Sequence, residues 1–258
     1  MRLILASLLT TVGAALPAQQ FDTRGIPADA AIVLVTAPTT GLKINSSPAM
    51  KALRERLEKI AAKADKNSPK LDKILREEFG VDTNDTNSSF AVGLNIANGA
   101  TGRTLDFSGA AVLRMKVDPK KVEAFGKKRG IATFTAGGKT GWNALQFFAA
   151  VADPKAQPQA DGPDSFQLGL FVVDASTIVL AQPKDAAASF ASLAGKTPAY
   201  ALNAAQKTFT ADTGKAYGFF AVNLARLPSN PELEQTGLAN AMMAFGEKGP
   251  NQVFKIAA

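Results

Sequence analysis

The sequence predicts an α+β fold in which amphipathic helices cover one face of an antiparallel sheet. Residues 90–96 alternate apolar side chains with small or polar ones, which is typical of a strand with one buried face. Residues 50–64 carry apolar side chains three and four positions apart, which predicts a helix with one apolar stripe. Because both surfaces need an apolar partner, we expect the helices and the sheet to pack together.

The amino-terminal part is expected to contain one strand and two helices. Residues 30–35 form a short run rich in Ile and Val, which predicts a strand. The helix at 50–64 comes next. A second helix is expected at 68–79, because Pro69 suits the first helical turn and Gly80 suits a helix end.

The centre of the chain is expected to form a meander of strands interrupted by helices. Asp118 and Pro119 are typical of a helix start, and Gly130 of a helix end, so a short basic helix is expected between them. Gly137 and Gly138 lie between two alternating runs and predict a hairpin turn. The elements expected in this region are strands at 113–117, 131–135, 140–148, 166–173 and 177–181, and helices at 120–129 and 184–193.

The carboxyl-terminal part repeats the order of the amino-terminal part. A strand is expected at 216–224 and a helix at 231–245, in the same order as 30–35 and 50–64. We therefore predict a partial internal repeat. The expected organisation is a signal peptide at 1–18, an α+β domain at 19–196 and a strand–helix extension at 197–258, packed on the first domain.

The first eighteen residues predict export. Arg2 supplies a basic start, residues 3–16 are apolar apart from Ser and Thr, and Ala18 completes a small-residue cleavage site. The apolar run is shorter than the roughly 20 residues that span a bilayer, and no later run is long enough. Because the chain has no Cys to take a lipid, we expect a soluble periplasmic or secreted protein that is not lipid-anchored.

The composition removes several kinds of chemistry. The 258 residues include no His and no Cys, which excludes disulfides and Ser-His-Asp or Cys-His catalysis, and disfavours zinc and copper sites. We therefore expect no cofactor and favour a non-catalytic protein. The net charge is +7, which outside the cell points to anionic partners other than nucleic acid.

The densest basic segment is 114–139. It carries eight Lys and Arg residues against Asp118 and Glu123. The helix dipole accounts for basic residues in the last turn of the expected helix, and a solvated face is the simplest reading of the rest. The alternative is a surface that binds an anionic envelope polymer or lipid head groups. The candidate residues for that surface are Lys120, Lys121, Lys127, Lys128 and Arg129.

Two further motifs have simpler structural readings. Asp82, Asn84 and Asp85 are candidate calcium ligands in an oxygen-rich segment, but Gly93 stands where an acidic ligand is expected. The simpler reading is a loop between a helix and a strand. The Gly-Lys-Thr sequence that begins at Gly138 lacks the earlier glycine of a phosphate-binding loop, so we assign it to the hairpin.

Several of these segments resemble a known family. The matching features are 79–82 after the paired helices, Arg114 at a strand end before 118–123, the single Trp142 after a glycine hairpin, and 173–181 leading to 187–196. Together they resemble a family of uncharacterised exported bacterial proteins, of the domain-of-unknown-function type, over roughly residues 27–196. These features are structural, so the resemblance assigns no catalytic residue to this chain.

Two functions follow as hypotheses. The first is an exported, non-catalytic binding or structural protein of the envelope or extracellular space. The alternative is a carboxylate-dependent hydrolase of an extracellular polymer, which needs two carboxyl groups in one cavity. Glu77, Glu78, Asp82 and Asp85 are the acidic residues that lie closest together in the sequence.

Overall fold

A computed structural model of the chain describes residues 21–38, 71–81, 85–99, 105–153, 167–229, 235, 237–249 and 251–257. The predicted signal peptide at 1–18 and the predicted helix at 50–64 lie outside the described residues. No helix in the described ranges is long and apolar enough to cross a bilayer.

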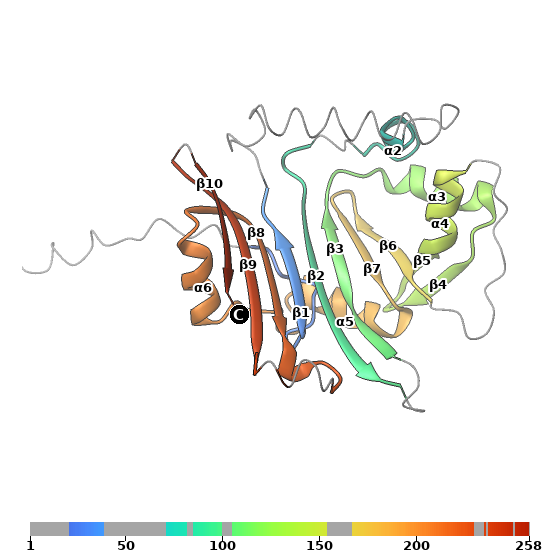
Figure 1. Ribbon diagram of the computed structural model, residues 1–258. Coiled ribbons are helices and arrows are strands. Elements are labelled where there is room, and N and C mark those ends of the chain that lie inside the picture. The colour runs from blue at the N-terminus through green and yellow to red at the C-terminus, as the bar shows by residue number, and fades with distance from the viewer. Residues whose placement is uncertain are drawn as a thin grey trace, which may run out of the picture.

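Ten strands of the described part form one antiparallel sheet that crosses the molecule (Figure 1). Along the sheet their order is β10-β9-β8-β1-β2-β3-β7-β6-β5-β4. The strands are β1 Ile32–Thr36, β2 Ser89–Asn98, β3 Leu105–Arg114, β4 Thr133–Ala136, β5 Lys139–Asn143, β6 Gly169–Asp174, β7 Thr177–Ala181, β8 Lys215–Asn223, β9 Asn240–Lys248 and β10 Asn251–Ala257. The strands near the carboxyl terminus therefore join the same sheet, because β8 pairs with β1.

The helices begin and end at residues that satisfy their free backbone groups. The side chain of Asp118 accepts the backbone N–H groups of Lys120 and Lys121 at the start of α3, and Gly130 ends that helix with φ +63°. Asn203 and Gln206 form a capping box at the start of α6. The described helices are α2 Leu71–Phe79, α3 Pro119–Arg129, α4 Ala144–Ala152, α5 Pro183–Leu193 and α6 Ala204–Ala211, and a 3₁₀ turn, η2, spans Leu224–Arg226.

The predicted hairpin is confirmed only in its first part. Gly137 and Gly138 have φ of +54° and +75° and join β4 to β5. The prediction of a strand through residue 148 is wrong, because α4 starts at Ala144. The side chain of Asn143 accepts the backbone N–H of Gln146 at 3.0 Å, which begins a helix where the apolar run continues.

The helix predicted at 231–245 is wrong from residue 237 onward, because residues 237–239 are not helical and a strand follows them. Residues 240–245 belong to β9, which pairs with β8 on one side and β10 on the other. Residues 231–234 and 236 lie outside the described residues. The segment has apolar residues at both helical and alternating positions, and pairing with two neighbouring strands decides in favour of the strand.

Two apolar cores lie on opposite faces of the sheet. In β7, Val179 and Ala181 belong to a core that includes residues of α5 and α6, whereas Ile178 and Leu180 belong to a core formed with α2, α3 and α4. Alternate residues of a strand point to opposite faces. The prediction of helices on one face therefore fails at β7, where helices pack on both. The continuous apolar run at 178–180 is the sequence signal for such a strand.

The segment before β1 is tied to the sheet and to α5. The Arg114 guanidinium, at the end of β3, binds the Asp22 carboxylate with Nε to Oδ2 at 2.7 Å. The backbone of Gly25 accepts the hydroxyl of Ser189 and donates to that of Ser192. These contacts fix the segment in place, and its residues 25–29 form part of the wall of a cavity that also includes residues of β2 and β3.

Candidate functional site

Two cavities lie on opposite faces of the sheet, and the first is apolar. It has a volume of about 440 Å³ and lies between α2, α4 and the strands β3, β6 and β7. Its base is part of an aromatic cluster, in which the Phe79 ring lies 5.3 Å from that of Phe147 and 4.9 Å from that of Phe125, between centroids. Its other walls are mostly aliphatic, and include Leu75, Leu113, Val151, Leu170, Ile178 and Leu180.

Ser88 is the polar exception in the apolar cavity. Among the described residues that line it, Ser88 has the only polar side chain, and its hydroxyl is buried with no hydrogen-bond partner in the described structure. A buried hydroxyl without a partner costs on the order of 1–3 kcal/mol. A ligand that is mostly apolar and has one oxygen atom placed to bind the Ser88 hydroxyl, just before β2, would complement this cavity.

The apolar cavity opens toward partly exposed apolar side chains. Phe148 of α4 lines it and is 46% exposed. On the sheet side, Leu113 of the cavity wall lies opposite Phe90 of β2, which is 36% exposed. The apolar surface therefore continues from the cavity onto β2. An acyl chain longer than the cavity would find further apolar surface there.

The predicted basic residues lie on α3, next to this cavity. Val122 of α3 lines the cavity, and the Nζ of Lys121 donates to the backbone oxygen of Glu77 in α2 at 2.7 Å. Lys120, Lys121, Lys127 and Lys128 are exposed, and Arg129 is half-buried with its guanidinium 5.5 Å from the centre of the Phe125 ring. Four of the five predicted residues are thus exposed on α3, the helix whose Val122 lines the cavity.

One of the α3 lysines already has an acidic partner. Lys127 Nζ lies 2.5 Å from Glu123 Oε1, and this hydrogen bond lowers the pKa of the Glu123 carboxyl. The pair lies at positions i and i+4 of an exposed helix, where it adds little stability. It leaves the helix with an excess of positive charge.

The predicted calcium ligands are described only in part. Asp82 and Asn84 lie outside the described residues. Asp85 accepts the backbone N–H of Asn87 at 2.9 Å and its side-chain amide at 3.0 Å, which is the geometry of a local turn. In the described ranges, no group of three acidic side chains is arranged to hold a metal ion.

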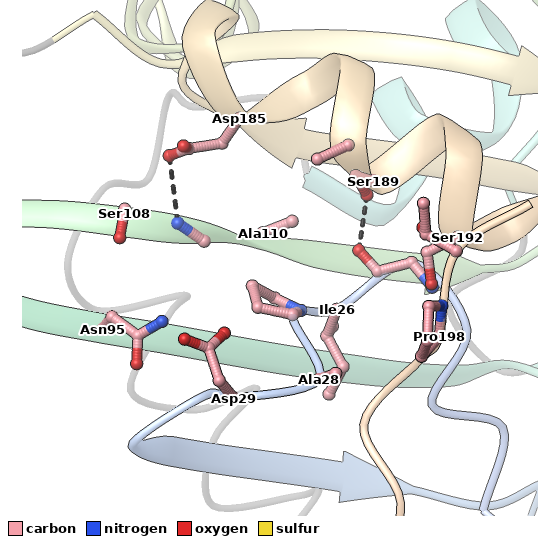
Figure 2. A pocket seen from close by; sticks show the side chains of 15 residues that line it. Ile26, Ala28, Asp29, Asn95, Ser108, Ala110, Asp185, Ser189, Ser192 and Pro198 are labelled. Atoms are coloured by element: carbon pink, nitrogen blue, oxygen red, sulfur yellow. Dashed lines mark hydrogen bonds between the residues drawn. The ribbon is translucent and has the colours of Figure 1, made fainter. Parts of the chain in front are cut away.

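The second cavity has a wall of mixed polarity that includes two carboxylates, and we call it the polar cavity; it lies on the other face, beneath α5 (Figure 2). Its volume is about 400 Å³. The segment 25–29, β2, β3 and α5 form its walls. Two carboxylates line it, Asp29 from the amino-terminal segment and Asp185 from the first turn of α5.

The pairing of β2 with β3 brings two polar side chains of this cavity together. Asn95 lies opposite Ser108 in the register. Asp185 Oδ2 accepts the backbone N–H of Gly109 at 3.0 Å, and Asn95 Oδ1 accepts that of Ala31 at 2.8 Å. Figure 2 shows these side chains and that of Asp29 around one part of the cavity.

No family model, curated protein or solved structure matches this chain. The resemblance to exported bacterial proteins over residues 27–196 therefore stays a prediction.

Sequence reasoning missed both carboxylates of the polar cavity. Glu77 and Glu78, which it put forward instead, lie on the exposed side of α2 and line neither cavity. Asp29 follows a proline and an alanine in a loop, and Asp185 occupies the first turn of a helix, where acidic residues are common for local reasons. No local signal in the sequence pairs them.

Proposed function

We propose that this chain is an exported, non-catalytic binding protein that holds the apolar chain of an anionic amphiphile in the cavity between α2, α4 and the sheet. The observation that carries the proposal is the lining: Ser88 is its one polar side chain among the described residues. The volume of about 440 Å³ lies in the range of small-molecule sites, roughly 300–1,000 Å³. Export, to the periplasm or outside the cell, rests on the predicted signal peptide.

The charge of α3 supports an anionic head group. Lys120 and Lys121 directly precede Val122, which lines the cavity, so an amphiphile bound there is expected to have its head group near this part of α3. The ammonium groups of these two lysines attract an anionic head group, and salt weakens this attraction. An anionic envelope polymer bound by α3 alone is the other partner consistent with this charge. Nucleic acid is not part of the proposal.

A charge at the mouth of the apolar cavity is expected to prevent amphiphile binding. Phe148→Asp places a carboxylate on the cavity wall and should weaken binding of oleate by about tenfold or more. The reason is that the acyl chain of oleate would then have to displace water from the carboxylate that the substitution introduces. The measurement is displacement of a fluorescent fatty acid by oleate. Leu145→Asp is the matched control, because Leu145 is 49% exposed on the same helix and does not line the cavity.

Equal weakening by the two variants would show that the cavity is not the binding site. If oleate does not displace the fluorescent fatty acid from the unmodified protein, the proposal is wrong. Circular dichroism of both variants checks that α4 is retained.

Reversing the charge of α3 is expected to reduce binding to anionic surfaces. Changing Lys120, Lys121, Lys127 and Lys128 to Glu should reduce sedimentation with phosphatidylglycerol vesicles at low salt, by roughly 1 kcal/mol for each lysine near the surface. The control changes four exposed lysines elsewhere, Lys196, Lys207, Lys215 and Lys248, to Glu. Both variants have the same net charge, so equal sedimentation would exclude α3 as the binding surface.

The alternative function is the carboxylate-dependent hydrolase, and one observation favours it. Asp29 and Asp185 line the same cavity, as two-carboxylate hydrolysis requires. This alternative predicts that the chain releases reducing ends from an extracellular glycan, and that Asp185→Asn abolishes the release. The binding proposal predicts that neither the unmodified protein nor Asp185→Asn cleaves the glycan.

The partial internal repeat also belongs to the proposal. The meander β1-β2-β3 and the meander β8-β9-β10 meet where β1 pairs antiparallel with β8. Two copies of one unit related by a two-fold axis between β1 and β8 produce this order. We propose that helices cover one face only of the strands that form the second copy.

A further inference from the structure

We infer that the amphiphile of the apolar cavity is a lipid with two acyl chains, one held in the cavity and the other lying across the apolar face of β2, β1 and β8. This inference rests on the proposed function, because it names the kind of amphiphile that the site takes. The observation behind it is a row of apolar side chains that leads from the cavity across the sheet.

Strand pairing places one apolar side chain from each strand in this row. Leu180 of β7 lines the cavity and lies opposite Ala111 of β3, and Ala111 lies opposite Val92 of β2. Directly opposite residues of paired strands share one face of the sheet. In the strands that follow, the row continues through Leu34, Phe220, Met243 and Ile256. The row therefore runs from the cavity to β10 (Figure 1).

The described helices leave most of this row uncovered. The core formed with α2, α3 and α4 on this face includes residues of β3, β5, β6 and β7, but none of β1, β2, β8, β9 or β10. Helices α5 and α6 pack with the core on the opposite face. Phe220 and Met243 are accordingly only half-buried, and Ile256 is 64% exposed.

The side chains next to the row are apolar as well. Leu94 and Ile32 lie opposite each other on one side of it, and Phe245 and Phe254 on the other, with ring centroids 4.9 Å apart. Among the described residues of β1, β2, β8, β9 and β10, charged side chains on this face lie at one end of the β8–β9 pair, where Lys215 is opposite Glu247. A contiguous apolar surface of this size marks a binding surface.

The row is longer than one acyl chain. Neighbouring strands lie about 4.8 Å apart, so the five steps from β3 to β10 span roughly 24 Å. One leaflet holds a single chain length in half of the hydrocarbon core, which is roughly 15 Å. A first chain can therefore occupy the cavity while a second lies along the row as far as β8, three strands from β3.

A lipid matches these features better than a second protein does. A second copy of the chain would cover the row, but a flat protein surface does not enter the cavity of about 440 Å³. An acyl chain is thin enough to enter it. The exposed lysines of α3 supply the charge that an anionic head group requires. A two-chain anionic lipid thus accounts for the cavity, the row and the basic helix together.

The test compares dioleoyl phosphatidylglycerol with its lyso form, which has the same head group and one chain. Each lipid displaces a fluorescent fatty acid from the full chain, and the half-displacing concentration is measured. Phe220→Asp should weaken displacement by the two-chain lipid by about tenfold, because its second chain would contact a charge. Displacement by the lyso form and by oleate should not change. Leu238→Asp is the matched control, since Leu238 is 43% exposed before β9 and outside the row.

A second measurement uses the unmodified protein, so that it does not depend on the folding of Phe220→Asp. Phosphatidylglycerol with a photoreactive diazirine at the end of one acyl chain is crosslinked to the protein, and the sites are identified by mass spectrometry. We expect crosslinks to β2, β1 or β8 as well as to the cavity. Crosslinks confined to the cavity, or to the face under α5 and α6, overturn the inference.

The other outcomes separate this inference from the proposed function. If oleate displaces the probe but dioleoyl phosphatidylglycerol does not, the two-chain lipid is wrong and the amphiphile proposal stands. If oleate fails as well, both are wrong. Equal weakening of the one-chain and two-chain lipids by Phe220→Asp overturns the inference. So does a dimer of the lipid-free protein that Phe220→Asp dissociates in analytical ultracentrifugation, because a second copy would then occupy the face.

Discussion

Replacing Phe171 by alanine is expected to lower the free energy of unfolding by about 3–5 kcal/mol. Phe171 lies in β6 and is 0% exposed. Its ring packs edge-on against that of Phe190 in α5, with centroids 5.4 Å apart and an interplanar angle of 76°. The loss of stability has two parts. The variant loses the free energy gained by burying the ring, and it retains an unfavourable cavity in the folded state.

The neighbours of Phe171 leave little room for the site to collapse. A Cβ at Gly141 or at Gly169 would lie 2.4 Å from ring atoms of Phe171, so the ring occupies the space of two absent side chains. Truncation therefore leaves a cavity that no flexible side chain at those positions can fill. The expected cost lies in the upper part of the range for core phenylalanines.

Urea unfolding followed by the fluorescence of Trp142, the one tryptophan of the chain, measures this effect. Phe254→Ala is the control, because Phe254 lies in β10 and is 53% exposed. Its expected cost is below about 1 kcal/mol. Similar costs for the two variants would mean that the core around β6 does not carry the stability assigned to it.

Replacing Asp22 by alanine is expected to destabilise the fold by about 2–3 kcal/mol near neutral pH. Asp22 Oδ2 lies 2.7 Å from Arg114 Nε and 2.6 Å from Arg24 Nη2. The Arg114 side chain is 17% exposed, and its Nη1 is buried with no hydrogen-bond partner in the described structure. Burial lowers the pKa of Arg114, and the negative charge of Asp22 acts against this shift, so removing the carboxylate leaves a largely buried guanidinium charge without its partner.

The same ion pair makes stability depend on pH. Burial raises the pKa of Asp22, but the hydrogen bonds from Arg24 and the charge of Arg114 outweigh it and leave this pKa below its ordinary value. A carboxyl with a lowered pKa in the folded state stabilises the fold above its unfolded pKa, about 3.9. That contribution is lost as the pH falls through the folded pKa.

We therefore expect the stability difference between the unmodified chain and Asp22→Asn to be full near neutral pH and to shrink below about pH 4. Urea unfolding at a series of pH values measures it. Asp212→Asn is the control, because Asp212 pairs with Lys255 at the surface and should cost less. A difference that stays constant down to the lowest pH would contradict the assigned role of Asp22.

Local elements of the fold are predictable from sequence because their causes lie within a few residues. The α3 helix follows from Asp118, Pro119 and Gly130, and each acts on backbone groups in its own turn. The hairpin between β4 and β5 follows from two glycines with positive φ. The helix α4 was not predicted, because its cap, Asn143, also ends a strand and the apolar run continues through both elements.

The candidate sites were predictable only where they lie on one segment. The basic residues of α3 are close together in the sequence, so their charge could be recognised without the fold. The apolar cavity could not, because its walls come from α2, α4 and three strands whose apolar residues each look like ordinary core. Ser88 gains its significance only from the apolar side chains that surround it.

By itself the sequence determined the composition-based exclusions, the caps and turns, and the expectation of export. Only the tertiary structure decided the strand order, the two-sided burial of β7 and the placement of Asp29 and Asp185 on the wall of one cavity. The physical reason is the distance along the sequence over which each interaction acts. Caps and turns are made by hydrogen bonds between near neighbours, whereas cavities and paired carboxylates arise from contacts between strands and helices that are distant in the chain.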